Sequence, residues 1–119
     1  MSISRKIIVA GSRTGISQND VSDILSNYSF QSDDIIITGG AIGVDQYAEK
    51  WAEENNLTIE TFYPDYKNNG KSAPLIRNCE MAEAGDILIA IHNGESRGTQ
   101  HMINSMKKLN KMVWYHEIK

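Results

Sequence analysis

The stretch from Thr38 to Asp45 reads Thr-Gly-Gly-Ala-Ile-Gly-Val-Asp and places three glycines between an apolar run and an amphipathic segment. This order predicts a strand, a glycine turn and the start of a helix. Such a turn can aim backbone amides at a phosphate group. A second interpretation holds at the same time: the turn needs glycine for its backbone angles and for close packing of the helix on the sheet.

The rest of the chain repeats this order of strand and helix. Strands are predicted at 6–10, 35–37, 57–62, 86–91 and 112–115, and helices around 21–25 and at 44–54, 75–84 and 99–109. The segment 63–70 has the composition of a surface loop. Strands that are apolar on both faces and alternate with helices indicate an α/β fold, a Rossmann-like three-layer sandwich. We expect a five-stranded, mainly parallel sheet and about four helices.

Length and charge limit the class of protein. The 119 residues are enough for one domain, predicted to span 1–119. The formal net charge of -3 and the pI near 5.5 make nucleic acid an unlikely partner. One cysteine, Cys79, and an N-terminus without an apolar leader favour a cytoplasmic location. The longest apolar runs have about five residues, so no membrane role is expected.

The polar and glycine-rich segments follow the predicted strands. In a parallel sheet these segments meet at one edge, where ligands bind. We therefore expect one cleft for a small nucleotide ligand. The predicted ligand-binding residues are Gly11, Ser12, Arg13, Gly39, Gly40, Gly43, Asp45, Asp65, Lys71, Arg77, Asn78, Ser96, Gly98 and Thr99.

Familiar cofactor motifs are not matched. The turn after the first strand, Gly11 to Gly15, is not the Gly-x-Gly-x-x-Gly of dinucleotide enzymes, which excludes ordinary NAD dehydrogenases. Gly70-Lys71-Ser72 imitates the end of a P-loop, but Asp65 stands where the first glycine is required. ATPase and GTPase chemistry is excluded, and no cofactor is predicted.

Other candidate groups have simpler interpretations. His92, His101 and His116 lack the spacing of a metal site, so no metal is predicted. Cys79 is expected on a buried helix face together with Ile76 and Ala82.

Several residues keep two interpretations. Asp45 suits the first turn of a helix, or it contacts a ribose hydroxyl. Ser96 and Thr99 are helix caps or phosphate contacts. Tyr63 and Tyr66 stack on a base or pack within their loop. Arg77 is predicted near the start of a helix, where the helix dipole does not stabilise a cation. An anionic ligand would explain why an arginine stands at this position.

Five motifs together resemble the YspA-like branch of the SLOG superfamily and span nearly the whole chain. They are Gly11-Ser12-Arg13, Thr38 to Ala52, Pro64-Asp65-Tyr66 with Gly70-Lys71, Arg77-Asn78-x-x-Met81 and Ser96-x-Gly98-Thr99-x-x-Met102-Ile103. The superfamily includes the Lonely guy nucleotide hydrolases, DNA-processing protein A and domains that sense nucleotide-derived signals. The resemblance implies a Rossmann-like fold and a ligand that carries phosphate and ribose.

One departure from the hydrolase branch matters. Met102 stands at the position of its catalytic glutamate, and a thioether cannot act as an acid or a base. Asp45 and Glu95 are the weak candidates to replace that glutamate, and the catalytic residues stay unknown. The first hypothesis is therefore a sensor or sequestering protein for a phosphorylated ribose ligand, either ADP-ribose-like or a cyclic nucleotide. The missing glutamate disfavours an enzymatic function. The alternative is a nucleotide 5'-phosphate N-glycosidase, and a single-stranded DNA-processing module is less favoured.

The resemblance also implies a homo-oligomer, a dimer or higher. Met102 and Met106 offer one apolar face for it, or they pack on the sheet.

Overall fold

The computed structural model describes residues 4–94 and 96–118. Five strands form one sheet in the order β3-β2-β1-β4-β5, and every neighbouring pair is parallel. The strands are β1 (Lys6–Gly11), β2 (Ile35–Thr38), β3 (Thr58–Thr61), β4 (Ile87–His92) and β5 (Met112–Glu117). The four longer helices are α1 (Gln18–Ser26), α2 (Val44–Glu54), α4 (Ala73–Ala84) and α5 (Arg97–Lys108).

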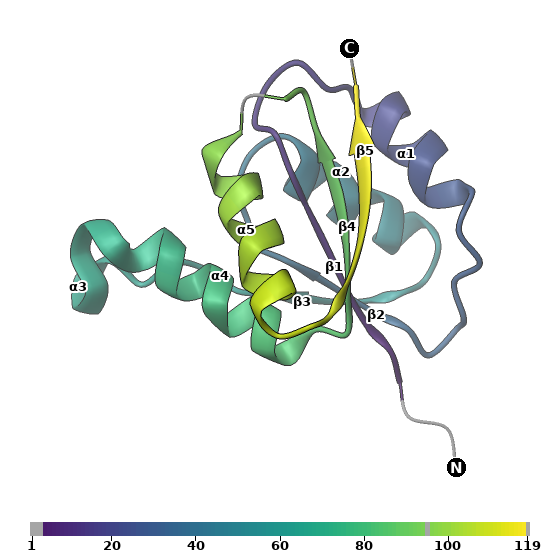
Figure 1. The fold of residues 1–119 in the computed structure, drawn as a ribbon. Helices are drawn as coiled ribbons and strands as arrows, with labels where there is room; N and C mark the ends of the chain where they lie inside the picture. The colour runs from purple at the N-terminus through teal and green to yellow at the C-terminus, as the bar shows by residue number, and fades with distance from the viewer. Residues whose placement is uncertain (1–3, 95, 119) are drawn as a thin grey trace.

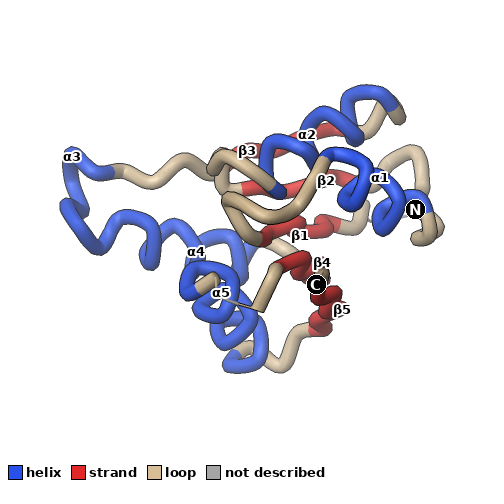
Figure 2. Tube along the Cα trace, turned by 90° about the horizontal axis from the view of Figure 1, so that it is seen from above, coloured by secondary structure: helices blue, strands red, loops and turns tan. Residues whose placement is uncertain are grey.

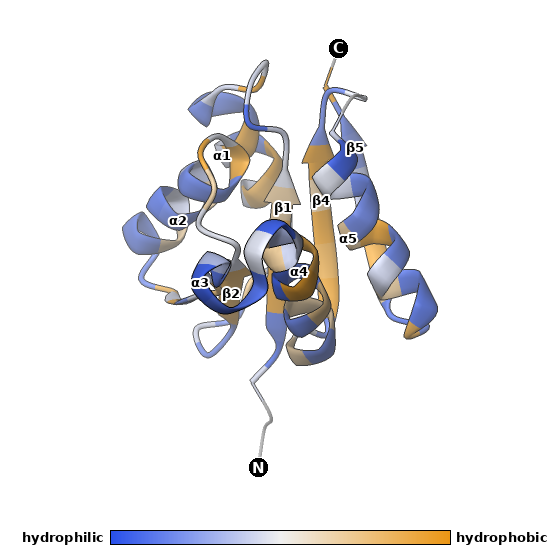
Figure 3. Cartoon of the chain, turned by 90° about the vertical axis from the view of Figure 1, so that its left-hand side faces the viewer, coloured by the Kyte–Doolittle hydropathy of each residue, from blue (hydrophilic) through white to orange (hydrophobic). Residues whose placement is uncertain are grey.

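The sheet lies between two layers of helices (Figures 1 and 2). Helices α1 and α2 bury one face, where Val21 and Val44 pack with Ile7 and other strand residues. Helices α4 and α5 bury the opposite face, where Met81 and Met106 pack against strand residues such as Ile8. Hydrophobic residues accordingly concentrate in the strands and on the helix sides that face them (Figure 3). The prediction of a Rossmann-like three-layer sandwich is confirmed.

The predicted loop 63–70 is only partly a loop. It contains α3 (Tyr66–Asn69), which a short 3-10 helix, η1 (Gly70–Ser72), joins to α4. The Asp65 side chain caps α3 by accepting from the backbone N–H of Asn68 at 3.2 Å and from its Nδ2 at 2.7 Å. Figure 1 shows α3 standing well away from the sheet. A single turn carries no hydrophobic periodicity, so the pattern in the sequence could not reveal it.

The expected buried face of α4 is wrong in part. Cys79 and Ile76 are exposed, whereas Ala82 is buried as expected. Two polar residues, Arg77 and Asn78, take the inward positions instead. Their side chains are satisfied by hydrogen bonds in the interior, which apolar periodicity does not predict.

The methionines of α5 belong to the core. Met102 and Met106 are almost completely buried against the sheet. Met102 and Met106 therefore pack on the sheet and cannot form the exposed apolar face of an oligomer.

The sheet changes its winding direction between β1 and β4. From β1 the chain moves outward to β2 and β3, and it then returns to build β4 and β5 on the other side. The loops that follow β1 and β4 separate at this point, which is where ligands bind in open parallel sheets. No helix within residues 4–94 and 96–118 has the length and apolar character needed to cross a bilayer.

Candidate functional site

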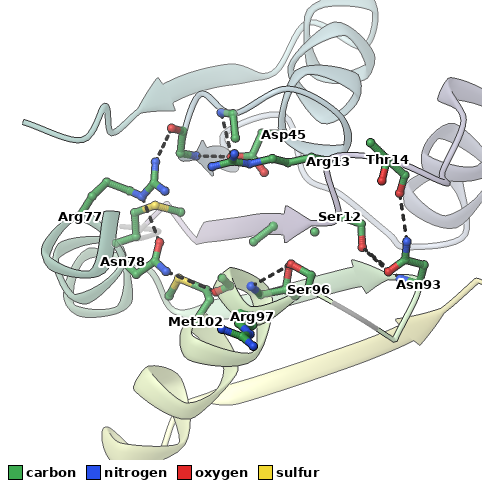
Figure 4. A pocket seen from close by; sticks show the side chains of 17 residues that line it. Ser12, Arg13, Thr14, Asp45, Arg77, Asn78, Asn93, Ser96, Arg97 and Met102 are labelled. Atoms are coloured by element: carbon green, nitrogen blue, oxygen red, sulfur yellow. Dashed lines mark hydrogen bonds between the residues drawn. The ribbon is translucent and has the colours of Figure 1, made fainter. Parts of the chain in front are cut away.

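A cavity of about 370 Å³ opens at the point where the winding changes direction (Figure 4). Its volume falls within the range of small-molecule sites. The cavity is lined by Ala10, Gly11, Ser12, Arg13, Thr14, Gly39, Ala41, Asp45, Arg77, Asn78, Met81, Asn93, Ser96, Arg97, Gly98, Thr99 and Met102.

Ten of the fourteen predicted ligand-binding residues line this cavity. They are Gly11, Ser12, Arg13, Gly39, Asp45, Arg77, Asn78, Ser96, Gly98 and Thr99. Asp65 and Lys71 are exposed beside α3 and are not part of the lining. Gly40 and Gly43 also lie outside it and shape the turn instead. Gly43 has φ +83°, and a Cβ there would lie 2.4 Å from the Ser12 carbonyl oxygen, so its role is structural.

The glycine turn after β2 is held by Asp45. One carboxylate oxygen, Oδ2, accepts hydrogen bonds from the backbone N–H groups of Gly39 at 3.0 Å and Ala41 at 3.3 Å. These two amides are therefore already paired and are not free to bind a phosphate. Asp45 thus stabilises the turn that precedes its own helix, and its contact with a ribose stays a prediction.

Arg77 holds the same turn from the other side. Its Nη1 donates to the carbonyl oxygens of Gly39 and, at 3.4 Å, Phe62, and its Nε donates to Asn78 Oδ1 at 3.0 Å. A Cβ on Gly39 would lie 2.5 Å from Nη1, so only glycine admits the guanidinium here. Nη2 has no hydrogen-bond partner among the described residues, and Arg77 lines the cavity. Burial lowers the pKa of Arg77, and the nearby Asp45 charge opposes this change.

Burial also changes the acidity of Asp45. The side chain is 6% exposed, and its burial raises the pKa to about 6. The Ala41 and Gly39 amides and the Arg77 charge oppose this rise without cancelling it, because they stabilise the ionised form. A buried carboxyl group that titrates near neutral pH inside a cavity is typical of functional sites.

Ser12 joins the loops that follow β1 and β4. Its hydroxyl donates to Asn93 Oδ1 at 3.1 Å and accepts from the Asn93 backbone N–H at 3.0 Å. Asn93 Nδ2 in turn donates to the Thr14 carbonyl at 3.2 Å. The Ser12 proton is thus used within the protein, and Asn93 is a site residue that the sequence analysis missed. An asparagine directly after an apolar strand was the available signal.

The N-terminus of α5 forms the opposite wall. Ser96 Oγ accepts from the Thr99 backbone N–H at 3.2 Å and lies 2.7 Å from the Thr99 hydroxyl, so Ser96 is the N-cap of α5, whereas Thr99 lies within the helix and is not a cap. The amides of Arg97 and Gly98 have no partner among the described residues. Asn78 Nδ2 donates to the Gly98 carbonyl at 3.3 Å and so connects α4 to this wall.

The charges of the lining are unequal. Arg13, Arg77 and Arg97 are three of the four arginines of the chain, and Asp45 is the one acidic residue in the described lining. Met102 lies in the lining at the position where the hydrolase branch carries its glutamate. Glu95, the other acidic candidate, lies outside the described residues. No cluster of three or more metal-ligating side chains is found in the described part of the chain.

The two tyrosines after β3 lie outside the lining. Tyr63 and Tyr66 are 71% and 56% exposed, and the Tyr63 ring covers Gly40. The contact of Tyr63 agrees with the interpretation of packing near its own loop.

The geometry defines a parallel α/β protein with an arginine-lined cavity at the change in winding direction. The family model of the YspA, cpYpsA-related SLOG family matches residues 5–68. The "Gene 61 protein" of Mycobacterium phage D29 is 34% identical over 112 residues, which covers 87% of this chain and 90% of that protein. The chain belongs to the YspA, cpYpsA-related SLOG family, as its motifs predicted.

A solved structure shares the fold. DNA processing protein A (DprA) from Streptococcus pneumoniae matches with a TM-score of 0.78 at 16% sequence identity. The match covers 94% of this chain but 50% of that one, so the present chain spans half of its length.

The pKa of Asp45 predicts a pH dependence of stability. Because the folded pKa of about 6 lies above the ordinary aspartate pKa of 3.8, the stability due to this group is complete below pH 3.8 and is lost as pH rises through 6. The difference corresponds to roughly 3 kcal/mol. Asp45→Asn keeps an acceptor oxygen and removes the charge. Its unfolding free energy in urea, relative to the native chain, should rise by on the order of 2–3 kcal/mol between about pH 4 and pH 7.

The carboxyl carbon of Asp45 reports the same titration directly by NMR. A midpoint near 6 is expected. A midpoint near 4, or a stability difference that does not change with pH, would contradict the assignment.

Proposed function

We propose that the cavity binds an anionic, nucleotide-derived ligand with phosphate and ribose, and that the protein acts as a sensor or sequestering protein. The observation that carries the proposal is the gathering of Arg13, Arg77 and Arg97 in one cavity of a chain whose net charge is -3. Guanidinium groups bind phosphate through charge-assisted, often bidentate hydrogen bonds. Membership of the SLOG family supports a nucleotide-related ligand.

Different lining residues suit the phosphate, the ribose and the uncharged part of such a ligand. Arg13 and Arg97 are exposed at the cavity and, with the Arg97 and Gly98 amides that have no partner among the described residues, suit the phosphate. Asp45 would repel phosphate when ionised and suits a ribose hydroxyl instead. Ala10, Met81 and Met102 supply an apolar surface for the uncharged part of the ligand.

The acidity of Asp45 favours one alternative, a nucleotide 5'-phosphate N-glycosidase. A carboxyl group with a pKa of about 6 can donate a proton to a leaving base at neutral pH. Met102 argues against the arrangement of the hydrolase branch, because it puts a thioether where that arrangement needs a carboxylate. Binding without cleavage therefore remains the first proposal.

A role on single-stranded DNA has less support. The similarity to DNA processing protein A concerns the fold at 16% identity, and it spans half of that chain. The three cavity arginines mark a site of about 370 Å³, which suits one small ligand better than a long strand.

The arginines give the first test. AMP, ADP-ribose, NAD and cyclic nucleotides are screened by thermal shift, where a ligand at 100 times its Kd should stabilise the fold by about 2.7 kcal/mol. Arg13→Ala and Arg97→Ala should each weaken the best ligand roughly 10-fold or more, since each removes a charge-assisted contact. Lys67→Ala is the matched control, because Lys67 is an exposed cation on α3 outside the cavity.

Calorimetry measures the Kd values, and circular dichroism verifies that each variant is folded. Absence of stabilisation by every compound at millimolar concentration would overturn the proposal, as would equal losses in the Lys67 variant.

Chromatography of the same mixtures decides between binding and cleavage. An intact nucleotide after prolonged incubation is the expected result. Free base that appears with the native chain and disappears in Asp45→Asn would instead establish the glycosidase. Free base that persists in that variant would exclude Asp45 as the acid.

A further inference from the structure

The two edges of the sheet differ in their protection. Strand β3 has four residues, and its Glu60 forms an ion pair with Lys6 at 3.6 Å. Strand β5 has six residues, Met-Val-Trp-Tyr-His-Glu, with no proline and one acidic residue, Glu117. It pairs with β4 without interruption from Met112 to Glu117. Short strands, inward charges and bulges protect edges from pairing with other chains, and β5 lacks them.

Half of the backbone groups of β5 point away from the sheet. The N–H of Ile118 donates to the His92 carbonyl at 2.9 Å, so Ile118 faces β4. Successive residues of a strand alternate in this respect. The N–H and C=O groups of Val113, Tyr115 and Glu117 therefore point to the open side.

Exposed apolar side chains border this open edge. Met112 and Tyr115 are 54% and 47% exposed, and Leu109, in the turn before β5, is 44% exposed. Figure 1 shows β5 at the front of the molecule, and Figure 2 shows it at the end of the row of strands. No strand pairs with its outer side among the described residues.

We propose that the open edge of β5 pairs with β5 of a second copy of this chain, antiparallel, about a two-fold axis at Tyr115. This register sets Tyr115 opposite the partner's Tyr115 and Val113 opposite the partner's Glu117. Every outward residue is then paired, with about six backbone hydrogen bonds across the interface. The result is one continuous sheet through both copies.

Charge favours the second copy in this orientation. Lys107 and Lys108 end α5 close to the start of β5, and Glu117 ends β5 itself. An antiparallel arrangement brings Glu117 of one strand toward Lys107 and Lys108 of the other copy. A parallel arrangement would place like ends together, and it cannot close under the two-fold symmetry that most dimers have.

The edge is separate from the ligand cavity. Met112, Tyr115 and Glu117 do not line it. Ligand binding therefore serves as an independent measure of folding when the edge is changed.

The test compares two exposed tyrosines. Sedimentation equilibrium of the full chain, up to about 1 mM, should give twice the mass of a single chain. Tyr115→Lys places like charges on the two-fold axis and should return the mass to that of one chain. Tyr63→Lys is the matched control, because Tyr63 is 71% exposed beside Gly40, away from β5, and it should remain dimeric.

A second variant and a second measurement distinguish loss of the interface from misfolding. Glu117→Lys should weaken the dimer at least 10-fold, and adding Lys107→Glu and Lys108→Glu should restore it. Hydrogen exchange of the Val113, Tyr115 and Glu117 amides should slow at least 10-fold as the chain is concentrated. The proposal is overturned if the native chain stays monomeric, if the dimer survives Tyr115→Lys, or if it dissociates with Tyr63→Lys. It is also overturned if the charge exchange does not restore the dimer, or if exchange of the edge amides does not depend on concentration.

Discussion

The hydrogen bonds that Asp45 and Arg77 make to the backbone of Gly39 are the constraint on which the site depends. Asp45 binds the N–H groups of Gly39 and Ala41, while Arg77 binds the Gly39 carbonyl. Three elements, β2, α2 and α4, are thereby joined at one residue, Gly39, that lies at the cavity. A charged pair buried in this way costs free energy by desolvation, and the raised pKa of Asp45 expresses that cost.

These hydrogen bonds decide which groups are available to a ligand. The Gly39 and Ala41 amides of the glycine turn are satisfied within the protein, so the turn shapes the cavity and the proposed anion recognition falls to other groups. Arg13 and Arg97 are exposed at the cavity, and the start of α5 adds the amides of Arg97 and Gly98, which are unpaired within residues 4–94 and 96–118. Arg77 holds the turn and also lines the cavity. The family's nucleotide ligands and these donors are chemically consistent.

Much of the fold could be predicted because its signals are local. Strands buried on both faces and helices with one apolar side leave clear periodicities. The loops after the strands then had to converge, which located ten of the lining residues. The partners of those residues could not be predicted, because Arg77 meets a carbonyl 38 residues away. The same long-range contact explains why Arg77, and not Cys79, lies on the buried side of α4. Asn93 and Arg97 were not among the predicted ligand-binding residues, although the position of Asn93 directly after an apolar strand was an available signal.

An NMR titration with ADP-ribose distinguishes the two sets of backbone amides at the cavity. The amides of Arg97 and Gly98 should shift strongly and saturate together, while those of Gly39 and Ala41 should change little because Asp45 already holds them. The largest shifts at Gly39 and Ala41, or no shifts around the cavity with any of the nucleotides, would show that these roles are wrong.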